Sequence, residues 1–124
     1  MSAGQHEIIV VDDDDGMSRA IERLLGTAGW RVCSFPSGEA LLASGMFREA
    51  AVLVIDIHLP GISGLELHRQ LLAQGGKAPV IFVTGQDRPR ISDLIRRTGA
   101  AGYFTKPFAG NELIDAIGRH VPAA

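Results

Sequence analysis

The chemistry open to this sequence depends on five polar side chains, each of which lies just after a short apolar run. They are Asp12, Asp13, Asp56, Thr84 and Lys106. Carboxylates that meet in one place repel one another unless a cation joins them, and oxygen ligands suit a hard cation such as Mg²⁺. A lysine pairs with anionic oxygens, and a hydroxyl can donate to a phosphoryl oxygen. An aspartate among such groups can act as a nucleophile, so the set is suited to phosphoryl transfer.

Apolar runs and helix-period segments alternate along the chain, and they decide where these polar residues lie. Continuous apolar runs predict strands buried on both faces, whereas apolar residues three and four apart predict amphipathic helices. The expected strands cover residues 7–11, 30–35, 51–55, 80–83 and 102–105, and the expected helices cover residues 17–28, 36–46, 65–73, 91–98 and 113–121. Gly29 is the expected left-handed cap of the first helix.

This alternation predicts an α/β fold with a doubly wound five-stranded parallel sheet and five helices, because right-handed crossovers put helices on both faces. Ligands bind such sheets at the carboxyl ends of the strands. Four of the five expected strands deliver a carboxylate, a hydroxyl or an ammonium group to that edge, and only the strand ending at Phe35 does not. The polar residues are therefore expected to form one site.

Composition limits the class of protein. The chain has 124 residues, 46% of them hydrophobic, a formal net charge of −2 and one cysteine. These values predict a single domain over residues 1–124, with its core at about 7–121, and give no reason to expect nucleic-acid binding. The longest apolar run, residues 50–55, is too short to span a membrane, and the first residues lack the apolar segment of a signal peptide. A cytoplasmic protein is expected.

From about Ile8 to Val121 the sequence resembles the receiver domain of two-component response regulators. Four pieces carry the resemblance: Val-Val-Asp-Asp-Asp at 10–14, Ile-Asp-Ile-His-Leu-Pro-Gly-Ile-Ser-Gly at 55–64, Val-Thr-Gly at 83–85 and Gly-Ala-Ala-Gly-Tyr-Phe-Thr-Lys-Pro-Phe at 99–108. The residues of the last two pieces are most similar to those of the nitrogen-fixation (FixJ-like) branch. The resemblance implies the flavodoxin-like strand order 2-1-3-4-5.

The resemblance also implies roles for individual residues. Asp56 would be the phosphoacceptor. Asp12 and Asp13, together with Asp56 and the backbone carbonyl of His58, would hold Mg²⁺ (or Mn²⁺).

Further roles concern the phosphoryl group and the response to it. Thr84 and Lys106 would bind the phosphoryl group, and Tyr103 would be an aromatic switch residue. The side chains of His58 and Gln86 would tune the lifetime of the phosphoryl group. The bond between Lys106 and Pro107 would be cis. The switch would remodel the face formed by the last strand and the helices on either side of it.

Several of these residues also have simpler interpretations. Asp14 and Asp15 are expected to cap and begin the first helix, where carboxylates suit the helix dipole. Thr84 could instead only cap the turn that follows its strand. Cys33 is expected to be buried filler rather than a redox sensor. The four histidines are scattered, which argues against a histidine metal site.

Two functions are compatible with the sequence. The first is a phosphorylation-dependent switch that receives its phosphoryl group from a sensor histidine kinase or phosphotransfer protein. It would control an output domain or partner protein, form a weak or phosphorylation-dependent homodimer, and be no enzyme beyond its own phosphorylation and dephosphorylation. The alternative is a phosphorylation-independent protein-interaction module with a receiver fold; such modules usually lack one of the site residues, and all are present here. The chain could be a stand-alone receiver or part of a longer regulator.

Enzymes of the same fold class fit less well. A flavodoxin-like protein would need a phosphate-cradling loop after the first strand, where four aspartates stand instead. Neither glycine-rich nucleotide-binding motif occurs. A haloacid-dehalogenase-type phosphatase would require a second aspartate two residues after its nucleophile, and His58 occupies that position.

Overall fold

The computed structural model describes residues 7–85 and 89–121. The strands are β1 (Glu7–Val11), β2 (Arg31–Phe35), β3 (Val52–Asp56), β4 (Val80–Thr84) and β5 (Gly102–Thr105). The helices are α1 (Asp15–Gly26), α2 (Gly38–Ser44), α3 (Gly64–Ala73), α4 (Pro89–Thr98) and α5 (Gly110–Gly118), and the short 3-10 helix η1 (Met46–Glu49) follows α2.

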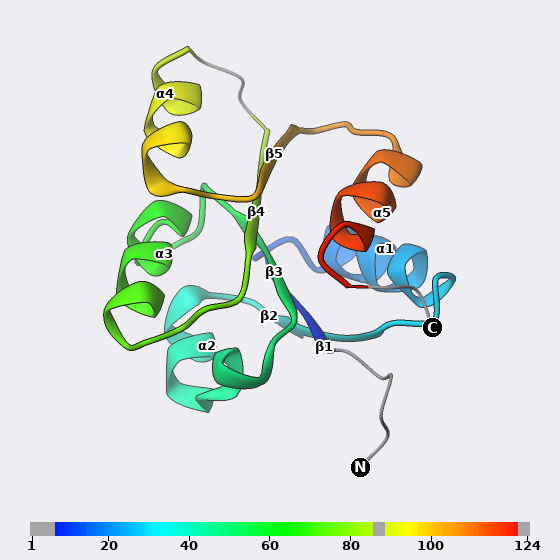
Figure 1. Cartoon of the computed structure of the whole chain (residues 1–124), viewed down its shortest axis with the longest axis horizontal. Helices are drawn as coiled ribbons and strands as arrows, with labels where there is room; N and C mark the ends of the chain where they lie inside the picture. The colour runs from blue at the N-terminus through cyan, green and yellow to red at the C-terminus, as the bar shows by residue number, and fades with distance from the viewer. Residues whose placement is uncertain (1–6, 86–88, 122–124) are drawn as a thin grey trace.

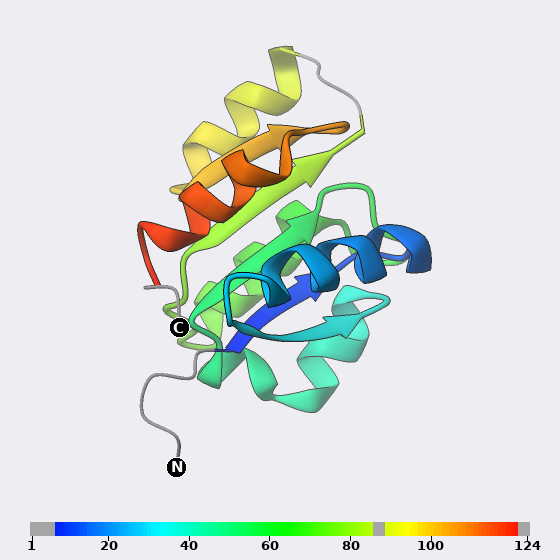
Figure 2. The same cartoon turned by 90° about the vertical axis from the view of Figure 1, so that its right-hand side faces the viewer.

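The five strands form one parallel sheet in the order β2-β1-β3-β4-β5, which confirms the predicted fold class and strand order. Helices α1 and α5 cover one face of the sheet, and α2, α3 and α4 cover the other (Figure 1). The strands run in the same direction, so their carboxyl ends meet at one edge (Figure 2). None of the helices in the described residues has both the length and the apolarity to cross a membrane.

Each central strand is apolar throughout because its residues alternate between two separate cores. The side chains that pack beneath α1 and α5 are Ile8, Val10, Val52, Val54, Ile81 and Val83. Those that pack beneath α2, α3 and α4 are Ile9, Val11, Leu53, Ile55, Val80 and Phe82. At the carboxyl edge this alternation reaches polar residues, because Asp12 and Asp56 continue the rows of Val10 and Val54.

The predicted helix ends were partly wrong. α1 ends at Gly26, two residues before the predicted end, and Gly29 has a φ of 88° in the turn rather than acting as the helix cap. Ala28 nevertheless packs against the core, so the apolar period continued beyond the last helical residue. The last helix ends at Gly118, although Val121 beyond it is buried. Apolar periodicity reports burial, and burial continues through a well-packed turn.

His68 of α3 is a buried polar residue outside the predicted site. Its side chain is 6% exposed, its ring centroid lies 5.5 Å from that of Phe82 in an edge-on arrangement, and its Nδ1 has no hydrogen-bond partner among the described residues. Burial lowers the pKa of His68 from 6.5, because a charged imidazole would lose its hydration there. The folded protein therefore favours the neutral form of this ring.

Replacing His68 with Leu should make the free energy of unfolding less sensitive to acid. Below pH 6.5 the unfolded wild type takes up a proton that the folded protein does not, so its stability falls as the pH drops toward the folded-state pKa of His68. The variant lacks this proton, and its stability should fall less between about pH 7.5 and about pH 5.5. Urea unfolding of both proteins at the two pH values measures the difference. Equal losses of stability would contradict the prediction.

Candidate functional site

Asp12 and Asp13 leave the carboxyl end of β1 in a turn held by hydrogen bonds. The Asp12 amide donates to the carbonyl of Phe35 at 3.1 Å, and Asp12 Oδ1 accepts from the amide of Asp14 at 2.9 Å. Asp14 then caps α1 as predicted, with its Oδ1 accepting from the amide of Met17 at 3.2 Å. Asp12 is 3% exposed, whereas Asp13 is open to solvent. The turn thus offers one buried carboxylate and one exposed carboxylate.

Ser18 of α1 was missed by sequence reasoning. Its hydroxyl is buried and donates to the carbonyl of Asp12 at 3.3 Å, so it ties the first helix to the turn of the acidic pair. A serine on the buried side of an amphipathic helix was the available signal. Asp15 begins α1 as predicted, and it forms an exposed ion pair with Arg19 at 2.6 Å.

Asp56 is the last residue of β3 rather than the first residue after it. The ladder between β3 and β4 continues past it, because the amide of Ile57 donates to the carbonyl of Val83 at 3.0 Å. Asp56 is 6% exposed, and its Oδ1 accepts from the amide of His58 at 2.9 Å. A buried charge at the end of an apolar strand is costly unless neighbouring groups stabilise it.

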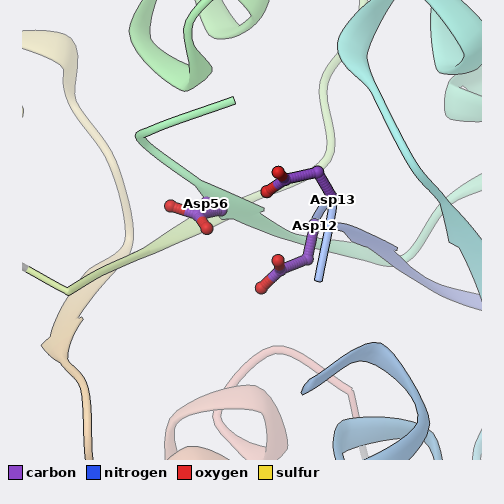
Figure 3. A group of neighbouring side chains, drawn as sticks. All are labelled: Asp12, Asp13 and Asp56. Carbon is purple, nitrogen blue, oxygen red and sulfur yellow. The ribbon is translucent and has the colours of Figure 1, made fainter. Parts of the chain in front are cut away.

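The carboxyl groups of Asp12, Asp13 and Asp56 form one cluster. One oxygen from each lies within 4.8 Å of the others, and the side chains of Asp12 and Asp13 turn toward Asp56 (Figure 3). In the part of the chain that the structure describes, this is the one group with the composition and spacing of a metal site, and it contains no histidine. The all-oxygen donor set fits a hard divalent cation such as Mg²⁺.

Lys106 joins this cluster from the residue after β5. Its Nζ lies 3.1 Å from Oδ2 of Asp12 and 3.1 Å from Oδ2 of Asp56, and its amide donates to the carbonyl of Thr84 at 2.7 Å. The bond from Lys106 to Pro107 is cis, as the resemblance implied. Three carboxylates and one ammonium group leave an excess of two negative charges, which a divalent cation would balance.

The pKa shifts in the cluster reflect burial and pairing. Burial raises the pKa of Asp12 from 3.8, and this outweighs the opposite effects of the Asp14 amide and of Lys106. Burial alone would lower the pKa of Lys106, but its hydrogen bonds to Asp12 and Asp56 prevail and raise it from 10.5. The lysine is thus held charged, while burial disfavours the charged form of Asp12. A bound cation would stabilise that charged form.

Thr84 and Tyr103 lie on β4 and β5, on the sheet face covered by α3 and α4. Thr84 is fully buried at the end of β4, two residues beyond Phe82. Tyr103 pairs with Phe82 in register, and its half-buried side chain packs against the same core. Strand alternation therefore puts the threonine and the tyrosine on one face, toward α4.

The other residues singled out from the sequence are His58, Gln86 and Cys33. The side chain of His58 is exposed, and Gln86 falls outside the described residues. Cys33 on the edge strand β2 is half-buried rather than buried as predicted, because β2 has a neighbour on only one side. Burial is still the main cause that raises the pKa of its thiol from 9.0, which disfavours the reactive thiolate.

A doubly wound parallel sheet with an acidic cluster and a lysine at its carboxyl edge defines a flavodoxin-like α/β protein whose clustered carboxylates have the composition of a divalent-cation site. The profile of the response regulator receiver domain matches residues 8–118. The chain belongs to the response regulator receiver domain family, which confirms the resemblance that the sequence predicted.

Individual proteins of this family align with most of the chain. Nodulation protein W of Bradyrhizobium diazoefficiens is 34% identical over 110 residues, covering 89% of this chain and 48% of that protein. Transcriptional regulatory protein FixJ of Azorhizobium caulinodans is 35% identical over 108 residues, covering 87% and 51%. FixJ-like regulators are thus among the relatives, as predicted, and the chain spans about half the length of these two proteins.

Solved structures agree with this assignment. The BeF3-activated DrrB receiver domain superposes with a TM-score of 0.85 at 29% identity, over 94% of this chain and 97% of that one. Response regulator StyR superposes with a TM-score of 0.86 at 31% identity, over 94% of this chain and 59% of that one.

Proposed function

We propose that this chain is a phosphoacceptor domain of a two-component phosphorelay, with Asp56 as the residue that is phosphorylated. The observation that carries the proposal is a buried carboxylate at a strand end that shares one lysine with a second buried carboxylate and lies in a three-aspartate cluster. A surface acidic patch would not hold two carboxylates away from water beside one shared ammonium group. The family gives the same role to receiver domains.

In this proposal Asp12, Asp13, Asp56 and the backbone carbonyl of His58 hold the metal. Bound Mg²⁺ would neutralise charge on the oxygens of the incoming phosphoryl group. A carboxylate oxygen of Asp56 attacks phosphorus, the O–P bond forms, and the P–N bond of a phosphohistidine donor breaks. Lys106, which bridges Asp12 and Asp56 at 3.1 Å from each, is within reach to follow the negative charge onto the phosphoryl oxygens.

The response to phosphorylation is proposed to pass through Thr84 and Tyr103. The Thr84 hydroxyl would move toward the phosphoryl group and bind one of its oxygens. This movement would let the Tyr103 ring turn inward. Thr84 and Tyr103 share the sheet face beneath α4, and Tyr103 packs on the core of that face. This shared position supports the proposed coupling. The α4–β5–α5 face would then change its affinity for an output domain, a partner protein or a second copy of the chain. His58 and Gln86 would tune the phosphoryl lifetime.

The domain is proposed to act on itself and not on a pool of substrate, assisting only its own phosphorylation and hydrolysis. Its phosphoryl donor would be a sensor histidine kinase or a phosphotransfer protein in the cytoplasm. Residues 7–121 would be the core of a single receiver domain.

Incubation with a small phosphodonor and Mg²⁺ should add one phosphoryl group to the chain, measured as intact mass. Removal of Mg²⁺ with a chelator should suppress the gain, because three clustered carboxylates would otherwise repel the anionic donor. If Mg²⁺ and donor produce no gain, and a beryllofluoride mimic leaves the amide spectrum unchanged, the phosphorylation-independent interaction module becomes the better explanation.

A further inference from the structure

The loop of residues 57–63, which follows Asp56, carries the backbone carbonyl proposed as a metal ligand. Both ends of the loop are held by local hydrogen bonds. At its start the amide of His58 donates to Oδ1 of Asp56 at 2.9 Å, and at its end the amide of Gly64 donates to the carbonyl of Ile57 at 2.9 Å. The middle of the loop is held by a residue from another element.

That residue is Glu39, an exposed acid in the first turn of α2. Its Oε2 accepts a hydrogen bond of 3.0 Å from the amide of Ile62, 23 positions further along the chain. Gly61 leaves room for this contact, because a side-chain carbon there would collide with the carboxylate of Glu39. Gly61 also has a φ of 72°, in the left-handed region that favours glycine.

The contact between Glu39 and the loop is supported by close packing at Gly38, the residue before Glu39. A side-chain carbon at Gly38 would lie 2.9 Å from Cδ1 of Ile62, so the start of α2 and the loop pack directly against each other. This packing therefore fixes the position of Glu39 relative to the loop. An acid in the first turn of a helix is favoured by the dipole wherever its side chain points, so the dipole alone does not explain a hydrogen bond across to the loop.

We propose that Glu39 is a positioning residue for the metal site: by accepting from the amide of Ile62 it fixes the loop whose backbone would complete the ligands around Asp56. This inference rests on the proposed function. Mg²⁺ demands near-ideal octahedral geometry, so a backbone ligand must be held in place before the ion arrives. Replacing a residue that orients a metal ligand commonly lowers metal affinity roughly 10–100-fold. Glu39 lies on an exposed surface, which favours the lower end of that range.

Calorimetric titration of the full chain with Mg²⁺ tests the proposal without any phosphodonor. Glu39→Ala should weaken Mg²⁺ binding roughly tenfold. Glu39→Gln keeps an acceptor oxygen but removes the charge, and it should bind Mg²⁺ nearly as the wild type does. Glu112→Ala removes an acid from the first turn of α5, which covers the opposite face of the sheet from α2 (Figure 1), and it should leave the affinity unchanged.

Amide hydrogen exchange of the metal-free protein supplies a second readout. Glu39→Ala should speed exchange at Ile62 and His58 roughly tenfold while leaving Val10 in β1 unchanged, and Glu39→Gln should restore slow exchange. Unaltered Mg²⁺ affinity in Glu39→Ala would overturn the proposal, and so would an equal loss in Glu39→Gln, since charge alone would then be the cause. A wild type that fails to bind Mg²⁺ would overturn the metal site itself, and with it this role of Glu39.

Discussion

Replacing Asp56 with Asn should reduce phosphoryl incorporation to the background of the phosphodonor alone. The neutral amide is a poor nucleophile, and the variant also removes one of the three carboxylates of the cluster. Size and shape are nearly unchanged, so the amide oxygen can still accept from the amide of His58 and the strand should keep its place. Intact mass after incubation with a small phosphodonor and Mg²⁺ measures the effect, with circular dichroism to verify the fold.

Asp13→Asn is the informative companion variant. It removes an exposed carboxylate of the same cluster but leaves the proposed nucleophile in place. It should slow incorporation and raise the Mg²⁺ concentration required, without abolishing the mass gain at saturating Mg²⁺. Full incorporation in Asp56→Asn would mean that another residue accepts the phosphoryl group, and peptide mapping would identify it.

Replacing Gly64 with Ala should lower the free energy of unfolding by about 3 kcal/mol, at the upper end of the usual cost of overpacking. A side-chain carbon at Gly64 would collide with the carbonyl oxygen of Asp56, and it would lie 2.8 Å from Cα of Ile57 and 3.0 Å from the carbonyl carbon of Asp56. All three are backbone atoms, so no side-chain rotation can relieve the contact. The end of β3 or the start of α3 must move. Urea unfolding of the variant and the wild type measures the loss.

Gly118→Ala is the matched control for this substitution. Gly118 is the last residue of α5, and a side-chain carbon there would meet nothing within 4 Å. Its free energy of unfolding should stay the same or rise by up to about 1 kcal/mol, because alanine restricts the unfolded chain more than glycine does. Equal stability of Gly64→Ala and the wild type would mean that the loop can move away from the start of α3 at little cost.

The sequence predicted which edge of the sheet carries the site, but it did not predict the contacts between the side chains at that edge. Asp12, Asp56 and Lys106 each follow an apolar run, and the carboxyl ends of parallel strands share one edge, so their meeting could be expected. The equal distance of Lys106 from Asp12 and Asp56 could not be expected, because a flexible four-carbon side chain is placed by its neighbours. Nor could the contact of Glu39 with Ile62 be expected, since they lie 23 positions apart in the chain with a strand between them.

By itself the sequence determined the alternation of strands and helices, the parallel sheet and the kinds of chemical group at its edge. Those features follow from periodicity and chain direction, which are local properties. Tertiary structure alone decided which carboxylates are buried, where the lysine is shared, and which glycines tolerate no side chain. The burial of Asp12 beside an exposed Asp13 depends on the neighbouring strands, helices and turns, and so does the close approach of Gly64 to the backbone of Asp56. Such properties arise from packing between distant segments, which no local pattern encodes.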